Sequence, residues 1–200
     1  MAKIILNKNL FLARGGERDC YILPDDNNKI VKILHLKGKH NNQNELEYQY
    51  MKHIEKNLKD FSHIVRCYGF IDTNLGKGLV FDRVLDYDGE QSRCFRYTVL
   101  KKILTREHEL KLVEELKQYI LKNNILFIDA TLVNILCQRV SDKEYKLIII
   151  DGLGGRRKGI KSTLYNYSLL FTKYKVRKQW KKFLNNYYHE RSLDVEYGSF

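Results

Sequence analysis

The sequence predicts an α+β fold with two lobes, a small strand-rich amino-terminal lobe with one long helix and a reduced helical carboxyl-terminal lobe. In residues 1–34 and 64–85, short apolar runs alternate with turn residues, which is typical of antiparallel strands. Between them, residues 41–60 carry apolar side chains at steps of three and four, which indicates a helix. After residue 95 the spacing is mostly helical. We therefore expect strands first and helices later, in one structural unit.

The amino-terminal lobe is expected to comprise residues 1–87. Turn residues delimit its strands, as at Gly15-Gly16 and in the polar runs at 25–28 and 72–76, because these residue types favour tight reversals. The apolar runs between the turns predict strands at residues 4–6, 10–13, 20–23, 29–34, 64–71 and 78–85.

The carboxyl-terminal lobe is expected to comprise residues 88–200. Helical spacing predicts helices at 95–104 and 107–123, and Asn123-Asn124 is a suitable carboxyl cap for the second. Short apolar segments at 125–128 and 132–137 precede a strand at 145–150, and the tail at 161–188 predicts one or two helices rich in lysine and aromatic residues.

Composition narrows the class of protein. Hydrophobic residues make up 44% of the chain, which is enough for a packed core and excludes a disordered tail. Lys and Arg exceed Asp and Glu by 36 to 24, a formal charge of +12, which predicts attraction to phosphates, nucleic acid or anionic lipid. The chain has no run approaching the roughly 20 apolar residues of a membrane span. The four cysteines form no C-x-x-C pair, so we expect reduced packing residues.

The most informative residues are Asp129, Asn134 and Asp151. Asp129 precedes Asn134 by five positions, and Asp151 ends the apolar run 147–150 immediately before Gly152. An Asp at such a strand end projects its charge away from the core, where it can hold a hard cation. The D-x-x-x-x-N spacing matches the catalytic loop of phosphoryl transfer, in which the Asp accepts a hydroxyl proton and the Asn binds metal. Each piece alone also occurs in ordinary turns.

Upstream residues add a candidate phosphate site. Lys32 lies within the aliphatic run Ile30-Val31-Lys32-Ile33-Leu34, where an ammonium is costly unless it meets an anion. Two carboxylates on the following helix are candidates. Glu47 shares the buried stripe with Met51, whereas Glu45 lies about 200° away around the helix, so we favour Glu47. In the alternative interpretation both glutamates only solvate the first turn.

In chain order, a glycine turn, a strand lysine, a helix glutamate, an Asp/Asn loop and a strand-end Asp-Gly resemble the protein kinase-like fold. Three longer runs, at residues 12–21, 68–81 and 150–154, are similar to the bacterial PhoP regulatory network family, the YrbL-like proteins. The similarity covers roughly residues 10–155. It implies a small bacterial protein with a kinase-like fold.

The resemblance implies a role for each candidate residue. ATP and Mg²⁺ would be the cofactors, with Gly15 and Gly16 near the phosphates and Lys32 paired with Glu47 to orient them. Asn134 and Asp151 would bind the metal. Asp129, together with Lys32, would be catalytic and would align the acceptor hydroxyl.

Departures from the protein-kinase pattern favour a small acceptor. Phe127 and Ile128 stand where such kinases carry His-Arg, and Leu153 follows Asp151-Gly152 in place of the usual motif. The 49 residues after Asp151 are fewer than an activation segment and a full helical substrate platform require. We therefore expect a phosphotransferase acting on a hydroxyl of a small-molecule, saccharide or lipid-linked acceptor.

Other functions stay open at this point. A pseudokinase or regulatory binding module would keep the fold without the reaction, and a nucleic-acid-binding protein is a weaker alternative that rests on charge alone. In the tail, Val176, Trp180, Phe183 and Tyr187 recur at helical steps, which favours core packing with a solvated lysine face. That charge could attract a polyanionic acceptor. We expect a cytoplasmic bacterial protein, with peripheral association at the inner membrane as an alternative.

Overall fold

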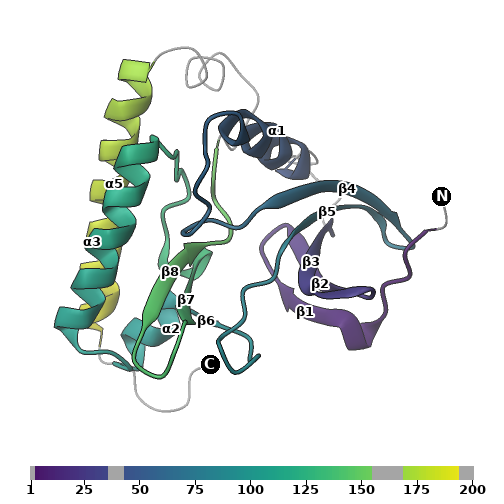
Figure 1. Cartoon of the computed structure of the whole chain (residues 1–200), viewed down its shortest axis with the longest axis horizontal. Coiled ribbons are helices and arrows are strands. Elements are labelled where there is room, and N and C mark those ends of the chain that lie inside the picture. Colours follow the sequence, from purple (N-terminus) through teal and green to yellow (C-terminus); the bar gives the residue numbers. More distant parts are fainter. Residues whose placement is uncertain (1–2, 36–42, 155–168, 194–200) are drawn as a thin grey trace. The chain divides into compact units, whose positions relative to one another are not determined.

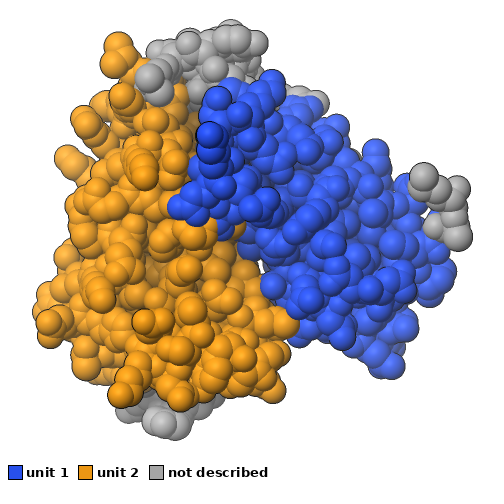
Figure 2. Space-filling view, viewed as in Figure 1, with its two compact units in different colours: residues 1–61, 65–83, 155–158 blue, residues 62–64, 84–154, 159–200 orange. Residues whose placement is uncertain are grey.

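The computed structural model describes residues 3–35, 43–154 and 169–193. The chain forms two compact units (Figure 2). Unit 1 comprises residues 1–61, 65–83 and 155–158, and unit 2 comprises residues 62–64, 84–154 and 159–200. The expected mixture of an antiparallel sheet and several helices is confirmed.

Unit 1 is built on a five-stranded antiparallel sheet (Figure 1). The strand order is β1-β2-β3-β5-β4, and every neighbouring pair is antiparallel. The sheet is preceded by a short 3₁₀ turn, η1 (Lys8–Leu10), and its two halves are connected through helix α1 (Gln43–Glu55). The strands are β1 (Phe11–Arg14), β2 (Arg18–Leu23), β3 (Asp26–Leu34), β4 (Cys67–Thr73) and β5 (Gly76–Asp82).

Alternation along β3 gives the sheet two different faces. Val31 and Ile33 lie in an apolar cluster with Leu6 and Val80. Lys32 points to the opposite face, because successive side chains of a strand alternate. Helix α1 packs against β3, β4 and β5 through its buried residues, which are Asn44, Leu46, Glu47, Tyr50 and Met51.

Several boundaries in unit 1 differ from the prediction. The reversal before β3 needs only residues 24–25, so the polar residues from Asp26 onward already belong to the strand. The apolar run 4–6 forms no strand. Ile4 makes a single bridge to Thr73, and the Asn74 side chain bonds both the amide and the carbonyl of Leu6, at 2.8 and 3.0 Å. Side-chain hydrogen bonds thus replace a ladder there.

Unit 2 combines helices with a three-stranded antiparallel sheet of order β6-β7-β8. Helix α3 begins one residue before the predicted start, after Thr105, whose hydroxyl accepts the amide of His108 at 3.2 Å. It ends at Asn124, which has φ 52° and makes the left-handed cap typical of Asn. The elements are β6 (Arg93–Cys94), α2 (Phe95–Leu100), α3 (Arg106–Asn123), η2 (Leu132–Asn134), β7 (Ile135–Arg139), β8 (Tyr145–Ile149) and α5 (Leu169–Ser192).

Helix α5 lies beside α3 (Figure 1). Its residues Val176, Trp180, Phe183 and Tyr187 are buried, so the predicted core stripe of the tail is confirmed. The predicted residues 161–168 lie outside the described part of the chain. At the α3–α5 contact, the fully buried carboxylate of Glu109 accepts a hydrogen bond from the Tyr187 hydroxyl at 2.8 Å and pairs with Arg191 at 3.0 Å.

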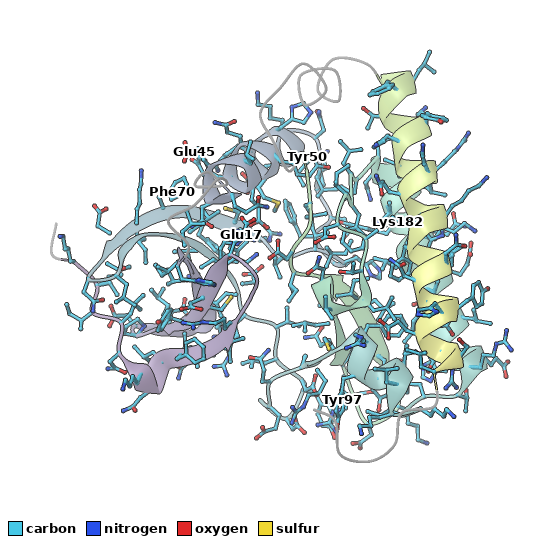
Figure 3. The ribbon with its side chains drawn as sticks, turned by 180° about the vertical axis from the view of Figure 1, so that it is seen from behind. Glu17, Glu45, Tyr50, Phe70, Tyr97 and Lys182 are labelled. Carbon is cyan, nitrogen blue, oxygen red and sulfur yellow. The ribbon has the colours of Figure 1, made fainter. Side chains whose placement is uncertain are left out.

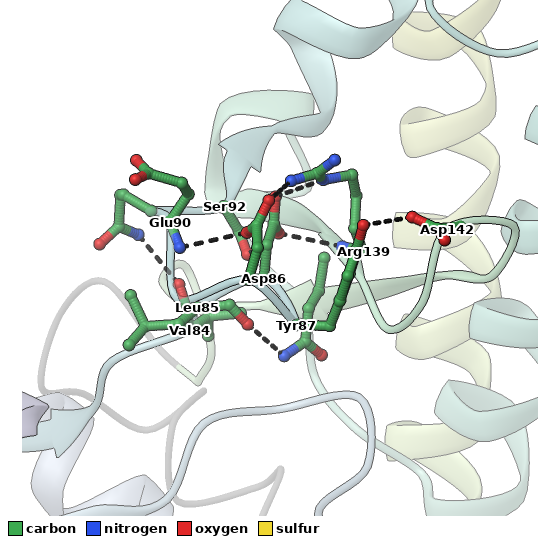
Figure 4. Close-up of polar contacts among 11 residues, drawn as sticks. Val84, Leu85, Asp86, Tyr87, Glu90, Ser92, Arg139 and Asp142 are labelled. Atoms are coloured by element: carbon green, nitrogen blue, oxygen red, sulfur yellow. Dashed lines mark hydrogen bonds and ion pairs between the residues drawn. The ribbon is translucent and has the colours of Figure 1, made fainter.

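A polar network fixes the segment that follows β5 (Figure 4). The Arg139 side chain pairs with Asp86 at 2.9 Å and also with Asp88, and the Ser92 hydroxyl donates to Asp86 at 2.5 Å. The pKa of Arg139 is raised by its hydrogen bonds to Asp86 and Asp88. This network holds residues 84–92 against β7.

The sequence predicts no membrane span and reduced cysteines. No described helix has the length and apolar character needed to cross a bilayer. None of the four cysteines forms a disulfide, and burial raises the pKa of the Cys67 thiol to about 11 and that of Cys137 to about 12.

We predict that Gly78→Ala will destabilise unit 1 by about 1–3 kcal/mol, the usual cost of overpacking a core. A methyl group at Gly78 would lie 2.3 Å from Val31 Cγ1 and 2.6 Å from Ile33 Cδ1. Urea unfolding measures the change. The control is Gly16→Ala, where a methyl group would meet no atom within 4 Å. Equal stability of the two variants would contradict the packing argument.

Candidate functional site

The first group of candidate residues lies in unit 1, around the buried side chain of Lys32. Strand β3 is internal to the sheet, and Lys32 is paired across the ladders with Cys20 on β2 and Leu79 on β5. Its side chain is only 4% exposed, and its ammonium lies 4.2 Å from the centre of the Phe81 ring. A charged amine at such depth requires an anionic partner.

Glu47 supplies that anion. Its carboxylate oxygens lie 3.3 and 3.4 Å from the Lys32 ammonium, and its side chain is 2% exposed. Glu45 is exposed to solvent. The difference follows from helix geometry, because residues two positions apart on a helix face different directions.

Two further polar residues complete this group, and sequence reasoning missed both. Arg18 is buried and forms a hydrogen-bonded ion pair with Glu47. Its guanidinium also donates to the side-chain oxygen of Asn44 at 3.0 Å, and the Asn44 amide donates to the carbonyl of Lys32 at 2.9 Å. The cluster thereby joins β2, β3 and α1. The sequence positions that could have identified them are that of Arg18, beside the glycine turn, and that of Asn44, one helical turn before Glu47.

The glycine turn joins β1 to β2. The Gly15 amide donates to the carbonyl of Arg18 at 2.8 Å, which closes the turn. Below it, Arg14 makes two 2.8 Å hydrogen bonds to Asp19, and these bonds lower the pKa of Asp19. Gly15 and Gly16 are exposed, so their backbone is accessible at the edge of the sheet.

The second group of candidate residues lies in unit 2, where two loops far apart in sequence are held together. The amides of Ile128 and Asp129 donate to the carbonyl of Gly152, at 2.9 and 3.1 Å. The amide of Ile150 donates to the carbonyl of Asn134 at 2.9 Å. The structure thus brings the loop carrying Asp129 and Asn134 against the segment carrying Asp151.

Gly152 allows this close approach. It has φ +82°, and a methyl group on it would lie 2.9 Å from the Asn134 side-chain nitrogen and 2.9 Å from Asp129 atoms. The glycine after Asp151 is therefore required both by its backbone conformation and by the space that the opposite loop occupies.

The apolar residues beside these polar groups anchor the loops. Phe127 is buried, pairs with Leu153 through an isolated bridge and contacts the Phe183 ring of α5, with ring centres 6.2 Å apart. Phe127 and Leu153 were noted above as departures from the kinase pattern. In this fold they form the apolar support that leaves Asp129 and Asp151 half-buried.

The donor set of unit 2 suits a hard divalent cation. The side-chain nitrogen of Asn134 donates to the Asp129 carbonyl at 2.9 Å, so the amide oxygen is the Asn134 atom that could bind a cation. Asp151 supplies carboxylate oxygens, one of which accepts the Gly152 amide at 2.6 Å. Oxygen ligands are those that Mg²⁺ prefers. Among the described residues no cluster of three or more His, Cys, Asp or Glu side chains suits a metal, so this amide–carboxylate pair requires further oxygens from a phosphate ligand or water.

Comparison with known proteins confirms the resemblance to the PhoP regulatory network family. The family model described as PhoP regulatory network protein YrbL matches residues 4–188. The chain is 30% identical over 189 residues to the uncharacterized protein YrbL of Escherichia coli strain K12, covering 90% of this chain and 86% of that protein. The same values hold for the uncharacterized protein YrbL of Shigella flexneri.

We predict that Glu47→Gln will lower the free energy of unfolding by about 3–5 kcal/mol, because the variant leaves two buried cations without their carboxylate. Glu45→Gln removes the same charge from an exposed position and should change stability by less than about 0.5 kcal/mol. Urea unfolding at neutral pH measures both. A small effect of Glu47→Gln would mean that Lys32 and Arg18 do not depend on it.

Proposed function

The chain belongs to the YrbL family of PhoP regulatory network proteins, and we propose that it is a kinase-like phosphotransferase that uses ATP and Mg²⁺. The observation that carries the proposal is the pair of loops in unit 2, which presents Asp129, Asn134 and Asp151 half-buried on an apolar support. In phosphoryl-transfer sites, an Asp accepts the proton, and an Asn five residues later and a strand-end Asp-Gly bind the metal.

Unit 1 supports the proposal with a separate part of the same machinery. A strand lysine held by a helix glutamate is the arrangement that places an ammonium on nucleotide phosphates in kinases. Here Glu47 and Asn44 hold the end and the backbone of Lys32, respectively. We propose that the turn at Gly15 and Gly16 lies near the phosphates, with Gly16 offering a backbone amide as nucleotide-binding turns do, while the Gly15 amide closes the turn.

The proposed reaction needs three tasks from this chain. Lys32 would orient the phosphates, and oxygen atoms of Asn134 and Asp151 would hold Mg²⁺. Bound Mg²⁺ would neutralise charge on the phosphate oxygens. Asp129 accepts the proton of the acceptor hydroxyl while the hydroxyl oxygen bonds to the γ-phosphorus. The bond from that phosphorus to the ADP oxygen breaks at the same time. The acceptor class that we propose is a small-molecule, saccharide or lipid-linked alcohol.

A regulatory binding module is the second candidate function. It is favoured by the family description, which places these proteins in a regulatory network. Such a module would bind nucleotide, or a partner, without turnover. The two experiments below separate binding from chemistry.

We predict that Mg²⁺ and ATP together will raise the melting temperature of the protein. A ligand that binds only the folded state adds about 2.7 kcal/mol at one hundred times its dissociation constant, which corresponds to several degrees for a chain of this size. Lys32→Met should lose most of the shift relative to its own ligand-free melting temperature. Lys77→Met, at an exposed position on β5, should keep it. An unchanged wild-type curve at millimolar nucleotide would count against nucleotide binding.

We predict that Asp129→Asn will reduce phosphoryl transfer or ATP hydrolysis by about 100-fold or more, the usual contribution of a general base. Nucleotide binding should change little, because Asp129 is not proposed to hold the phosphates. Asp25→Asn, in the exposed turn before β3, is the matched control. Turnover retained in Asp129→Asn would remove this residue from the base role, and wild-type binding without turnover would favour the regulatory module.

A further inference from the structure

We propose that the outer face of helix α5 is a docking surface for an anionic lipid bilayer. The proposal is independent of the reaction proposed above. It begins with charge, because α5 carries six cations between Leu169 and Asn185 and its first acidic residue is Glu190. Five of the six, all except the half-buried Lys175, are exposed: Lys173, Arg177, Lys178, Lys181 and Lys182.

The exposed cations of α5 differ from four other cations of unit 2, one of which lies near the end of the same helix. Arg96, Arg139, Arg191 and Lys117 each pair with a carboxylate. Among the described residues no such ion pair involves the five exposed cations of α5. They lie within about 14 Å along the axis, at 1.5 Å per residue. Within the described part of the chain, this side of α5 therefore carries positive charge that no carboxylate pairs with.

The inner face of α5 fixes the orientation of the outer one. Val176, Trp180, Phe183 and Tyr187 are buried in unit 2, and the Asn186 side chain donates to the carbonyl of Ala130 at 2.9 Å. The helix therefore cannot turn its apolar side outward without unfolding the unit. Figure 3 shows the long side chains that extend from α5, on which Lys182 is labelled.

Exposed apolar and aromatic side chains on the same face decide between lipid and nucleic acid. Leu170, Tyr174 and Tyr188 are 81%, 61% and 46% exposed. With Arg177 and Lys181 between them, they follow steps of four, three, four and seven, which places all five on one stripe of the helix. Tyrosine suits the headgroup region of a bilayer, and leucine suits the acyl boundary.

A single-stranded nucleic acid would require a different surface. Such ligands follow a basic groove in which aromatic rings stack successive bases. On α5 the two exposed tyrosines are fourteen residues apart, about 21 Å along the helix, and Leu170, one turn before Tyr174, offers no stacking surface. A convex helix surface that carries cations over about half of its circumference, with apolar residues near its two ends, fits a flat bilayer better.

The test is co-sedimentation with vesicles of phosphatidylglycerol and phosphatidylcholine in equal parts, compared with phosphatidylcholine alone. The wild type should sediment only with the anionic vesicles, and binding should fall steeply between about 0.1 and 1 M salt. The triple variant Arg177→Gln, Lys178→Gln and Lys181→Gln should weaken binding on the order of 100-fold, about fivefold for each cation. Wild-type protein that does not sediment with anionic vesicles at low salt would overturn the proposal.

The matched control is Lys56→Gln, Lys59→Gln and Lys143→Gln, which removes the same charge from exposed positions outside α5 and should retain binding within a few-fold. If the two triple variants lost vesicle binding equally, net charge alone would explain the effect, and the assignment to α5 would be overturned. A second variant, Leu170→Ser with Tyr174→Ser, keeps every cation and should weaken binding about tenfold. Unchanged binding of this variant, or binding of a single-stranded oligonucleotide in place of vesicles, would also overturn it. Melting curves of all variants establish that they are folded.

Discussion

The buried carboxylate of Glu47 is the group on which the interior of unit 1 depends. Two cations from neighbouring strands, Lys32 and Arg18, meet it below the surface, and Asn44 ties the guanidinium to the backbone of β3. Removing such charges from water costs several kcal/mol each, so an apolar cluster of the same volume would be at least as stable. Stability therefore gives no reason for a lysine in the centre of this sheet. Its presence is better explained by a task for the ammonium, which is why we place it on phosphate.

In unit 2, hydrogen bonds to backbone groups hold together the loops that carry the candidate residues. The carbonyl of Gly152 accepts two amides from the opposite loop, and the Asn134 side chain bonds the Asp129 carbonyl. These bonds use the backbone groups of the two loops and the side-chain nitrogen of Asn134, and they do not use the side-chain oxygen of Asn134. Phe127 and Leu153, which depart from the protein-kinase pattern, provide the apolar support of these loops. Phe127 and Ile128 leave no arginine at the two positions before Asp129, where protein kinases carry one.

Much of the fold was predictable, because periodicity alone separates strands from helices in a chain with clear turn residues. The helix at 107–123 and the core stripe of α5 were found in this way, and the buried side of α1 identified Glu47 over Glu45. The errors have local physical causes. Asn74 satisfies the backbone of Leu6 through its side chain, so the apolar run 4–6 needs no strand partner. The role of Arg18 depends on which way β2 faces, and alternation in a short strand does not fix that. The joining of both residue groups around one nucleotide stays a prediction, as do their roles.

Glu109 has a consequence for how the protein responds to acid. Burial raises its pKa, although the Tyr187 hydroxyl and Arg191 oppose that shift. A carboxyl group with a raised pKa in the folded state takes up its proton more readily there than in the unfolded chain. The folded state therefore gains relative stability as the pH falls through that pKa, and the penalty for the charged form applies above it. Most carboxylates that pair with cations behave in the opposite way. Protonation of Glu109 should thus leave the seam between the two long helices intact, whereas the contribution of Asp19, whose pKa Arg14 lowers, should be lost only below the ordinary Asp pKa.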